Sequence, residues 1–149
     1  MGRFVFKLKI TDAKKYMRMM RKEIIYPELS YKITGMLMQT QKELGRFCKE
    51  KQYADLFEIL LKKDGIIYKR EGSGSFKIGN DTIKGNRFDF VVDNKILVEL
   101  KAAPFITKRD YYQTMRYLKA MNLRLGLLVN LHSEYLKPKR ILNSSYHSC

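Results

Sequence analysis

The sequence predicts a single α/β domain in which helices flank a mixed β-sheet. Apolar residues recur at helical spacing through the first half of the chain, and they then switch to alternation or to short apolar runs typical of strands. The order of helices, several strands, one more helix and a further strand indicates an α/β domain. A chain of 149 residues suits one domain and can bury its own core.

The first half of the chain is expected to hold three helices. A basic, Met-rich segment at residues 12–24 has helical spacing and precedes Pro27, which should end or restart a helix. The next helix is expected from about residue 28 to 44, and the third from about 50 to 63. Tyr53 falls on the apolar face of the third helix, where a core position is favoured over a role in a site.

Strands and tight turns are expected from residue 66 onward. Residues 66–70 have the pattern of a strand, and the Gly/Ser-rich residues 72–75 that of a flexible loop. Two hairpins should follow, one turning at residues 79–81 and the other at residues 93–95.

A helix and two strands complete the expected domain. Thr107 and Asp110 form a capping-box pattern, which predicts a helix that reaches about Met121. The apolar residues 125–129 indicate a buried strand, and residues 139–142 a short edge strand. The domain is therefore expected at residues 27–143, after a basic and helical extension at 1–26 and before a loose tail at 144–149.

The net charge indicates a polyanionic partner. Thirty Lys and Arg residues against fifteen Asp and Glu residues give +15 at pH 7. Such a field attracts nucleic acid, and DNA is favoured over RNA as the partner. A membrane surface is not expected, because the basic helices lack an aromatic insertion face. A homodimer or an unidentified protein partner is compatible with the sequence.

The sequence also indicates an intracellular, cytoplasmic protein. No apolar run approaches the length needed to cross a bilayer, and the first residues lack the apolar core of a secretory signal. The two cysteines form no CxxC pair and the chain has two histidines, so a structural zinc site or an iron–sulfur cluster is not expected.

Two charged residues lie on one face of an otherwise apolar strand at residues 96–101. Glu99 and Lys101 are two residues apart, so their side chains share a face. Asp89 lies on the partner strand. A two-residue turn would place Asp89 opposite Val98, on the wrong face, whereas a three-residue turn would place it opposite Glu99. We predict the three-residue turn.

The predicted arrangement is that of a metal-dependent phosphodiesterase site. The carboxylates of Asp89 and Glu99 would form an oxygen site for Mg²⁺ or Mn²⁺. Lys101 could orient a water molecule or stabilise negative charge in the transition state. The alternative is a surface hairpin with a simple Glu–Lys pair, because the D-x₉-E-x-K pattern is common by chance.

The D-x₉-E-x-K pattern belongs to a set of seven sequence motifs that follow one another along the chain. They are Glu28–Gly35, Glu43-Leu44-Gly45, Glu50-x-x-Tyr53, Arg87-x-Asp89, Ile96–Ala102, Gln113-x-x-x-Tyr117 with Leu118-Lys119-Ala120, and Leu123–Asn130. The ordered set resembles the GxxExxY proteins, a branch of the PD-(D/E)xK nuclease superfamily, over about residues 27–143. One position departs from the family pattern, because Phe47 stands where a second glycine usually precedes the glutamate.

The resemblance implies a restriction-endonuclease-like core and a metal-dependent nuclease activity on DNA or RNA. It implies that Asp89 and Glu99 bind the metal, that Lys101 is the catalytic lysine, and that Glu50 is a further metal contact. For Gln113 it implies a place near the site, against the alternative of an ordinary exposed helix residue.

Further residues are expected to contact nucleic acid. They are Arg87, Lys108, Arg109, Arg116 and Tyr117. For Arg87, a phosphate contact and simple ion pairing are equally compatible with the sequence. The fold does not fix the function, so a catalytically inactive nucleic-acid-binding or protein-interaction module remains the alternative.

Overall fold

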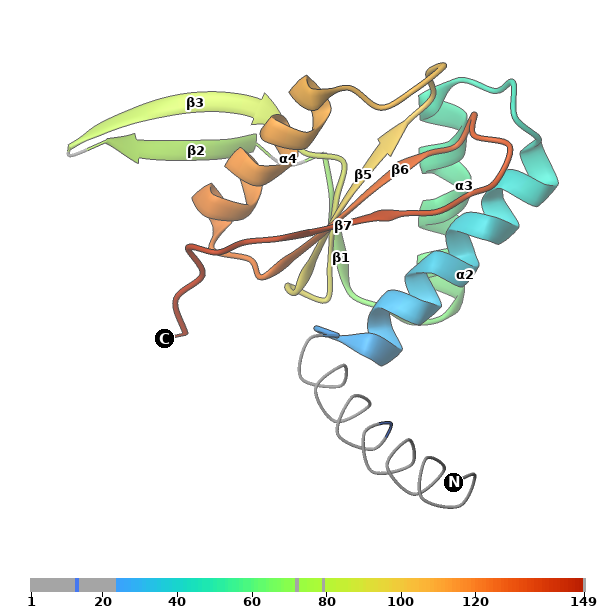
Figure 1. Ribbon diagram of the computed structural model, residues 1–149, viewed down its shortest axis with the longest axis horizontal. Coiled ribbons are helices and arrows are strands. Elements are labelled where there is room, and N and C mark those ends of the chain that lie inside the picture. The colour runs from blue at the N-terminus through green and yellow to red at the C-terminus, as the bar shows by residue number, and fades with distance from the viewer. Residues whose placement is uncertain (1–12, 14–23, 72, 79, 149) are drawn as a thin grey trace, which may run out of the picture.

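A computed structural model describes residues 13, 24–71, 73–78 and 80–148 of the chain (Figure 1). Its elements in chain order are α2 (Pro27–Leu44), α3 (Glu50–Lys63), β1 (Tyr68–Arg70), β2 (Ser73–Ile78), β3 (Asp81–Arg87), β4 (Phe90–Val92), β5 (Ile96–Lys101), α4 (Lys108–Met121), β6 (Leu125–Asn130) and β7 (Lys139–Leu142). The helix expected at residues 12–24, and most of the expected basic extension, lie outside the described residues.

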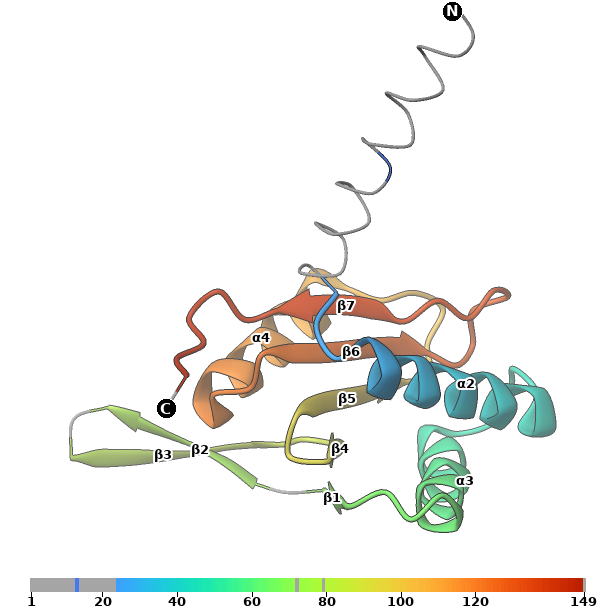
Figure 2. The ribbon, with the colours of Figure 1, turned by 90° about the horizontal axis from the view of Figure 1, so that it is seen from below.

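Five strands form one mixed sheet in the order β1-β4-β5-β6-β7. The neighbours β5 and β6 are parallel, and the other neighbours are antiparallel. The helix α4 connects β5 to β6 across one face of the sheet, while α2 and α3 cover the other face (Figures 1 and 2). The predicted α/β class, with helices on both faces of a mixed sheet, is confirmed. β2 and β3 form a separate antiparallel pair.

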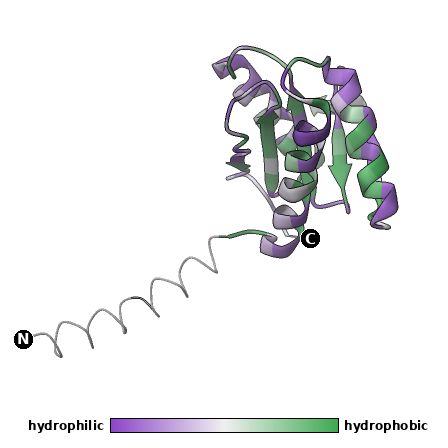
Figure 3. Cartoon of the chain, turned by 90° about the vertical axis from the view of Figure 1, so that its right-hand side faces the viewer, coloured by the Kyte–Doolittle hydropathy of each residue, from purple (hydrophilic) through white to green (hydrophobic). Residues whose placement is uncertain are grey.

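Alternate residues of β5 face opposite sides of the sheet. Three of them pack against α2 and α3: Ile96, Val98 and Leu100. Leu97 instead packs with Leu118 of α4. Glu99 and Lys101 share the face of Leu97, so both polar side chains are directed to the α4 side. Figure 3 shows the hydrophobic strands enclosed by helices that carry hydrophilic residues on part of their surface.

A glycine in β6 allows α4 to lie close to this face. A Cβ atom at Gly126 would come within 3.1 Å of Thr114 Cγ2 and 3.2 Å of Leu118 Cδ1. Contacts this short would force the helix or its side chains to move. Gly126 therefore helps to set the distance between α4 and the sheet face that carries Glu99.

Two expected turns differ from the structure. Residues 73–75, expected to belong to a flexible loop at 72–75, lie in β2. The turn expected at residues 79–81 is shorter, because Asp81 already pairs with Ile78. In both places, backbone pairing between β2 and β3 outweighs the local preference of Gly, Ser and Asp for turns. The other expected helices and strands in the described part of the chain are confirmed with ends within two residues, except that β3 extends three residues beyond the strand expected at 82–84.

The C-terminal residues are connected to the end of α4. Asn122 Nδ2 donates to the carbonyl of His147 at 2.8 Å, and the N–H of His147 donates to Asn122 Oδ1 at 3.0 Å. Buried Asn143 donates from Nδ2 to the carbonyl of Leu118 at 3.1 Å. These bonds hold the C-terminal residues against the end of α4.

The capping box predicted at the start of α4 is confirmed. The N–H of Asp110 donates to Thr107 Oγ1 at 3.3 Å, and the N–H of Thr107 donates to Asp110 Oδ2 at 2.9 Å. Asp110→Ala should lower the free energy of unfolding by about 1 kcal/mol, because it removes this bond and a negative charge at the helix N-terminus. Urea denaturation measures the change. Asp110→Asn, which keeps an acceptor, should lose less, and an unchanged midpoint in Asp110→Ala would contradict the prediction.

Candidate active site

The β4–β5 hairpin places Asp89 and Glu99 opposite each other. The register pairs Val92 with Ile96, which leaves residues 93–95 as the turn. The predicted three-residue turn is therefore confirmed. Continued by three residues beyond that pair, the same register sets Asp89, at the start of the hairpin, across from Glu99.

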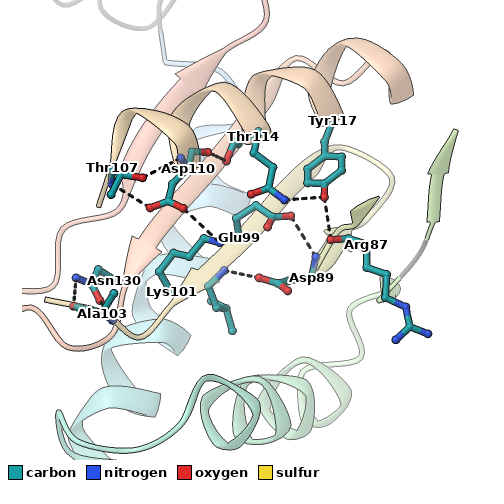
Figure 4. Close-up of polar contacts among 12 residues, drawn as sticks. Arg87, Asp89, Glu99, Lys101, Ala103, Thr107, Asp110, Thr114, Tyr117 and Asn130 are labelled. Carbon is teal, nitrogen blue, oxygen red and sulfur yellow. Dashed lines mark hydrogen bonds and ion pairs between the residues drawn. The ribbon is translucent and has the colours of Figure 1, made fainter. Parts of the chain in front are cut away.

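Two main-chain N–H groups orient these carboxylates. The N–H of Asp89 donates to Glu99 Oε1 at 3.1 Å, and the N–H of Leu100 donates to Asp89 Oδ2 at 2.7 Å (Figure 4). Among the described residues, Asp89 Oδ1 and Glu99 Oε2 accept no hydrogen bond. One oxygen of each carboxylate is therefore left for another ligand.

Burial makes the charges of this pair unfavourable without a cation. The Glu99 side chain is 4% exposed. Burial raises the pKa of Glu99 to about 8, and the charge of Asp89 is the second cause. Burial also raises the pKa of Asp89, against the opposing effects of the Leu100 N–H and the Lys101 charge. Neither carboxylate is in a salt bridge within the part of the chain that the structure describes. A bound cation would favour the ionised form of both.

Lys101 forms an ion pair with a residue that the motifs did not point to. Its Nζ lies 3.5 Å from Asp110 Oδ1, and both side chains are about one fifth exposed, at 24% and 19%. Burial is the largest single effect on the pKa of Asp110 and raises it. The hydrogen bonds from Thr107 and the charge of Lys101 together outweigh burial, so the pKa of Asp110 is lowered. The sequence marked Asp110 only as a helix cap. A signal was present, since the helix between two parallel strands must begin near the end of the first, where Lys101 lies.

Gln113 and Tyr117 form a hydrogen-bonded chain to the segment before Asp89. Gln113 Nε2 donates to the Tyr117 hydroxyl at 3.1 Å, and this hydroxyl donates to the carbonyl of Arg87 at 3.0 Å (Figure 4). Tyr117, expected to contact nucleic acid, is only 1% exposed, so its ring offers no surface to a polymer here. The Arg87 side chain is exposed and is directed away from the carboxylates. In this arrangement, Gln113 and Tyr117 fix the backbone beside Asp89.

Tyr117→Phe tests this supporting role. The substitution removes the hydroxyl and leaves the Arg87 carbonyl and the Gln113 amide without this partner, so the free energy of unfolding should fall by about 1–2 kcal/mol. Denaturation by urea measures the loss. Tyr112→Phe is the matched control on the same helix, because Tyr112 is 62% exposed, and its stability should not change. Equal effects in the two variants would contradict the assignment.

Two further acidic residues lie near the pair. Glu50 begins α3 at an exposed position; loss of hydration raises the pKa of its carboxylate, and the charge of Asp89 raises it further. Glu71, which the motifs did not indicate, donates its N–H to the Asp89 carbonyl at 2.8 Å, and its charge contributes to the raised pKa of Asp89. Among the described residues, no three His, Cys, Asp or Glu side chains converge closely enough to hold a metal ion. Asp89 and Glu99 are thus the two acidic residues of the site that lie directly against each other.

The basic residues of α4 are exposed, as expected for a nucleic-acid contact. Lys108 and Arg109 lie in the first turn of the helix, next to the ion pair between Asp110 and Lys101. Arg116 lies two turns further along. The outer side of the helix carries a hollow of about 670 Å³, lined by Arg109, Tyr112, Met115, Arg116 and Lys119.

A search of the described helices for a membrane-spanning segment finds none with the length and apolar character that such a segment needs.

The family of the chain follows from its sequence as well as its fold. A model of the PD-(D/E)XK nuclease superfamily matches residues 27–141, from the first residue of α2 to the last but one of β7. The chain belongs to the PD-(D/E)XK nuclease superfamily. Nucleases of this superfamily generally use divalent metal ions, and their name implies a nucleic-acid substrate.

Other comparisons add little to this assignment. No curated protein matches the chain. A solved structure titled "Crystal structure of SSO0001" is similar, with 16% identity and a TM-score of 0.47 over 74% of this chain. The match covers 66% of that chain, slightly less than two thirds of its length.

The residues of this candidate site fit a hard divalent cation. Carboxylate oxygens are the donors that Mg²⁺ and Mn²⁺ prefer, and Mg²⁺ commonly uses one or two carboxylates and completes its shell with water and substrate phosphate. Asp89 and Glu99 supply two such groups with one unbonded oxygen each. That no third acid converges with them in the described part of the chain does not conflict with this mode of binding.

Proposed function

We propose that the protein is a Mg²⁺- or Mn²⁺-dependent nuclease that hydrolyses phosphodiester bonds at Asp89, Glu99 and Lys101. One observation carries the proposal: the buried carboxylate of Glu99 and the half-buried carboxylate of Asp89 lie across one hairpin, and no cation of the described residues forms a salt bridge with either. Lys101 lies next to them on the same face of the sheet. A pair of this kind is unfavourable in an unused surface hairpin, because each buried charge requires compensation.

Each residue has a distinct task in this proposal. Asp89 and Glu99 hold the metal ion, and their N–H donors keep the free oxygens directed to one place. The bound ion supplies Lewis acidity toward a phosphate oxygen and lowers the pKa of a water molecule. Lys101 orients the attacking water or stabilises the charge that develops on the phosphate, and its ion pair with Asp110 fixes the position of Nζ.

The supporting residues are proposed to act around this centre. Glu50 makes an outer contact to the metal through water, since it is exposed and does not complete a three-ligand cluster. Gln113 positions the segment that carries Asp89. Lys108, Arg109 and Arg116 attract the nucleic-acid backbone, and Arg87 adds a phosphate contact. Within the superfamily, we place the chain among the GxxExxY proteins on the ordered motifs from Glu28 to Asn130.

A cleavage assay on four substrates tests the function. The purified protein is incubated with labelled single-stranded and duplex DNA and RNA, each with Mg²⁺, Mn²⁺ or EDTA. We expect cleavage that requires a metal, and DNA is the substrate we place first, although the site recognises a phosphodiester that both polymers share. Salt-sensitive binding without metal-dependent cleavage of any substrate would contradict the proposal and support an inactive nucleic-acid-binding module.

A further inference from the structure

Three loops meet at the edge of the sheet where the candidate active site opens. They are residues 45–49 between α2 and α3, residues 102–107 between β5 and α4, and residues 131–138 between β6 and β7. Because β5 and β6 are parallel, their C-terminal ends lie at the same edge, and Figures 1 and 2 show all three loops at this end of the molecule. Lys101 immediately precedes the second loop, and Glu50 immediately follows the first.

Hydrogen bonds connect the three loops to one another. The Asn130 side chain accepts from the N–H of Ala103 at 3.2 Å and donates to its carbonyl at 2.7 Å. Arg46 Nε donates to the carbonyl of His132 at 3.1 Å, and His132 Nε2 lies 2.7 Å from the carbonyl of Cys48. The loops therefore form one continuous rim beside the carboxylates.

Each loop of this rim presents one large aromatic ring to solvent. Phe47 is 91% exposed, Phe105 is 71% exposed and Tyr135 is 82% exposed. One exposed aromatic residue needs no explanation, but three on fastened loops at one edge mark a binding surface. The rings do not contribute to the core, so folding does not account for their presence there.

Exposed cations accompany these rings. The guanidinium of Arg46 lies 5.9 Å from the centre of the Phe47 ring. Other exposed basic residues on or next to the loops include Lys49, Lys108, Arg109, Lys137 and Lys139, beside exposed Glu50 and Glu134. Aromatic rings interleaved with an excess of positive charge are the groups that bind single-stranded nucleic acid, with bases on the rings and phosphates beside the cations.

We propose that Phe47, Phe105 and Tyr135 form a stacking surface for the unpaired bases of a single-stranded nucleic acid that enters the active site. Phe105 follows Lys101 by four residues, so their Cα atoms are at most about 14 Å apart, the length of roughly four stacked nucleotides. A strand whose phosphate lies at Lys101 can therefore reach the ring. Paired bases are already stacked within a duplex, so the surface selects single strands, ends or flaps. This inference rests on the proposed nuclease function and narrows its substrate.

Binding without catalysis tests the stacking surface. The full chain is titrated in EDTA with a labelled short oligothymidylate and with a duplex of the same length. Phe47→Ala, Phe105→Ala and Tyr135→Ala should each weaken binding of the single strand by roughly five- to a hundredfold and change duplex binding much less. Phe47→Tyr and Tyr135→Phe, which keep a ring, should bind as the wild type does.

Tyr31→Ala is the matched control. Tyr31 is 81% exposed on α2, thirteen residues before the helix ends at Leu44 and so roughly 20 Å from the rim. Its replacement should leave binding unchanged. Equal single-strand affinity in the wild type and all three rim variants, or equal losses for single strand and duplex, would overturn the proposal. So would a dimer in sedimentation that the rim variants dissociate, since a second copy would then occupy the surface.

Failure of the stacking surface and failure of the nuclease proposal give different experimental results. Ring-dependent binding of single strands by a protein that cleaves nothing would keep the stacking surface and reject the nuclease. If the three rim variants instead cleave single strands in the presence of metal with the affinity and rate of the wild type, the nuclease proposal stands and the stacking surface is rejected.

Discussion

Lys101→Met should lower metal-dependent cleavage at least about a hundredfold, because it removes the cation next to the carboxylates while keeping much of the side-chain volume. Metal binding should remain, since Asp89 and Glu99 are unchanged. Cleavage rates at saturating Mg²⁺ and calorimetric titration with Mn²⁺ measure the two properties separately. Loss of rate with binding preserved is the result expected for a group that acts on the reacting phosphate.

Lys95→Met provides the control for this substitution. Lys95 lies in the turn of the same hairpin, with a side chain 51% exposed and paired with Asp93 at 3.3 Å. Its replacement removes the same charge from the same hairpin, away from the carboxylates, and should leave the cleavage rate within about twofold of the wild type. A Lys101→Met protein with the rate of Lys95→Met would show that Lys101 has no part in the reaction.

Glu99→Gln should stabilise the metal-free protein at alkaline pH. Burial and the charge of Asp89 raise the pKa of Glu99 from 4.5 to about 8. Because the pKa of the folded state is the higher one, the stability that this group contributes is complete below 4.5 and is lost as the pH rises through about 8. Glutamine carries no charge and keeps an acceptor for the N–H of Asp89. At a pH of about 9, the variant should exceed the wild type by a few kcal/mol.

Urea denaturation in EDTA between pH about 5 and 9 measures this difference. The wild-type free energy of unfolding should fall across the window, and that of Glu99→Gln should fall less, with the remainder owing to the raised pKa of Asp89. The lowered pKa of Asp55 and of Asp110 affects stability only at lower pH, because that contribution is lost on acidification. Parallel curves for the two proteins would mean that Glu99 is not held in an unfavourable charged state.

The sequence was sufficient to place the central pair. Strand alternation put Glu99 and Lys101 on one face, and the requirement that Asp89 reach that face selected the three-residue turn. Pairing of Val92 with Ile96 confirms this register. The inference succeeded because the side-chain period of a strand is two, so the two possible turn lengths gave opposite faces.

Contacts between elements far apart in the sequence could not be predicted from the local sequence pattern. The ion pair of Lys101 with Asp110 depends on how α4 crosses the sheet, and Gly126 contributes to that approach. The burial of Tyr117 depends on the same packing, and exposure at one helix position does not follow from its neighbours. The first half of β2, residues 73–75, was expected as a loop because its Gly and Ser residues favour turns locally, while pairing with β3 stabilises extended backbone.

The most direct test of the central claim is the rate of nucleic-acid cleavage by the wild type and by Glu99→Gln, purified in parallel and assayed with Mg²⁺ and with EDTA. The proposed site predicts cleavage by the wild type in Mg²⁺ alone, and a rate for Glu99→Gln at least about a hundredfold lower, with the variant fully folded. Cleavage by Glu99→Gln at the wild-type rate would contradict the site. Absence of metal-dependent cleavage by the wild type on all four substrates would contradict the function.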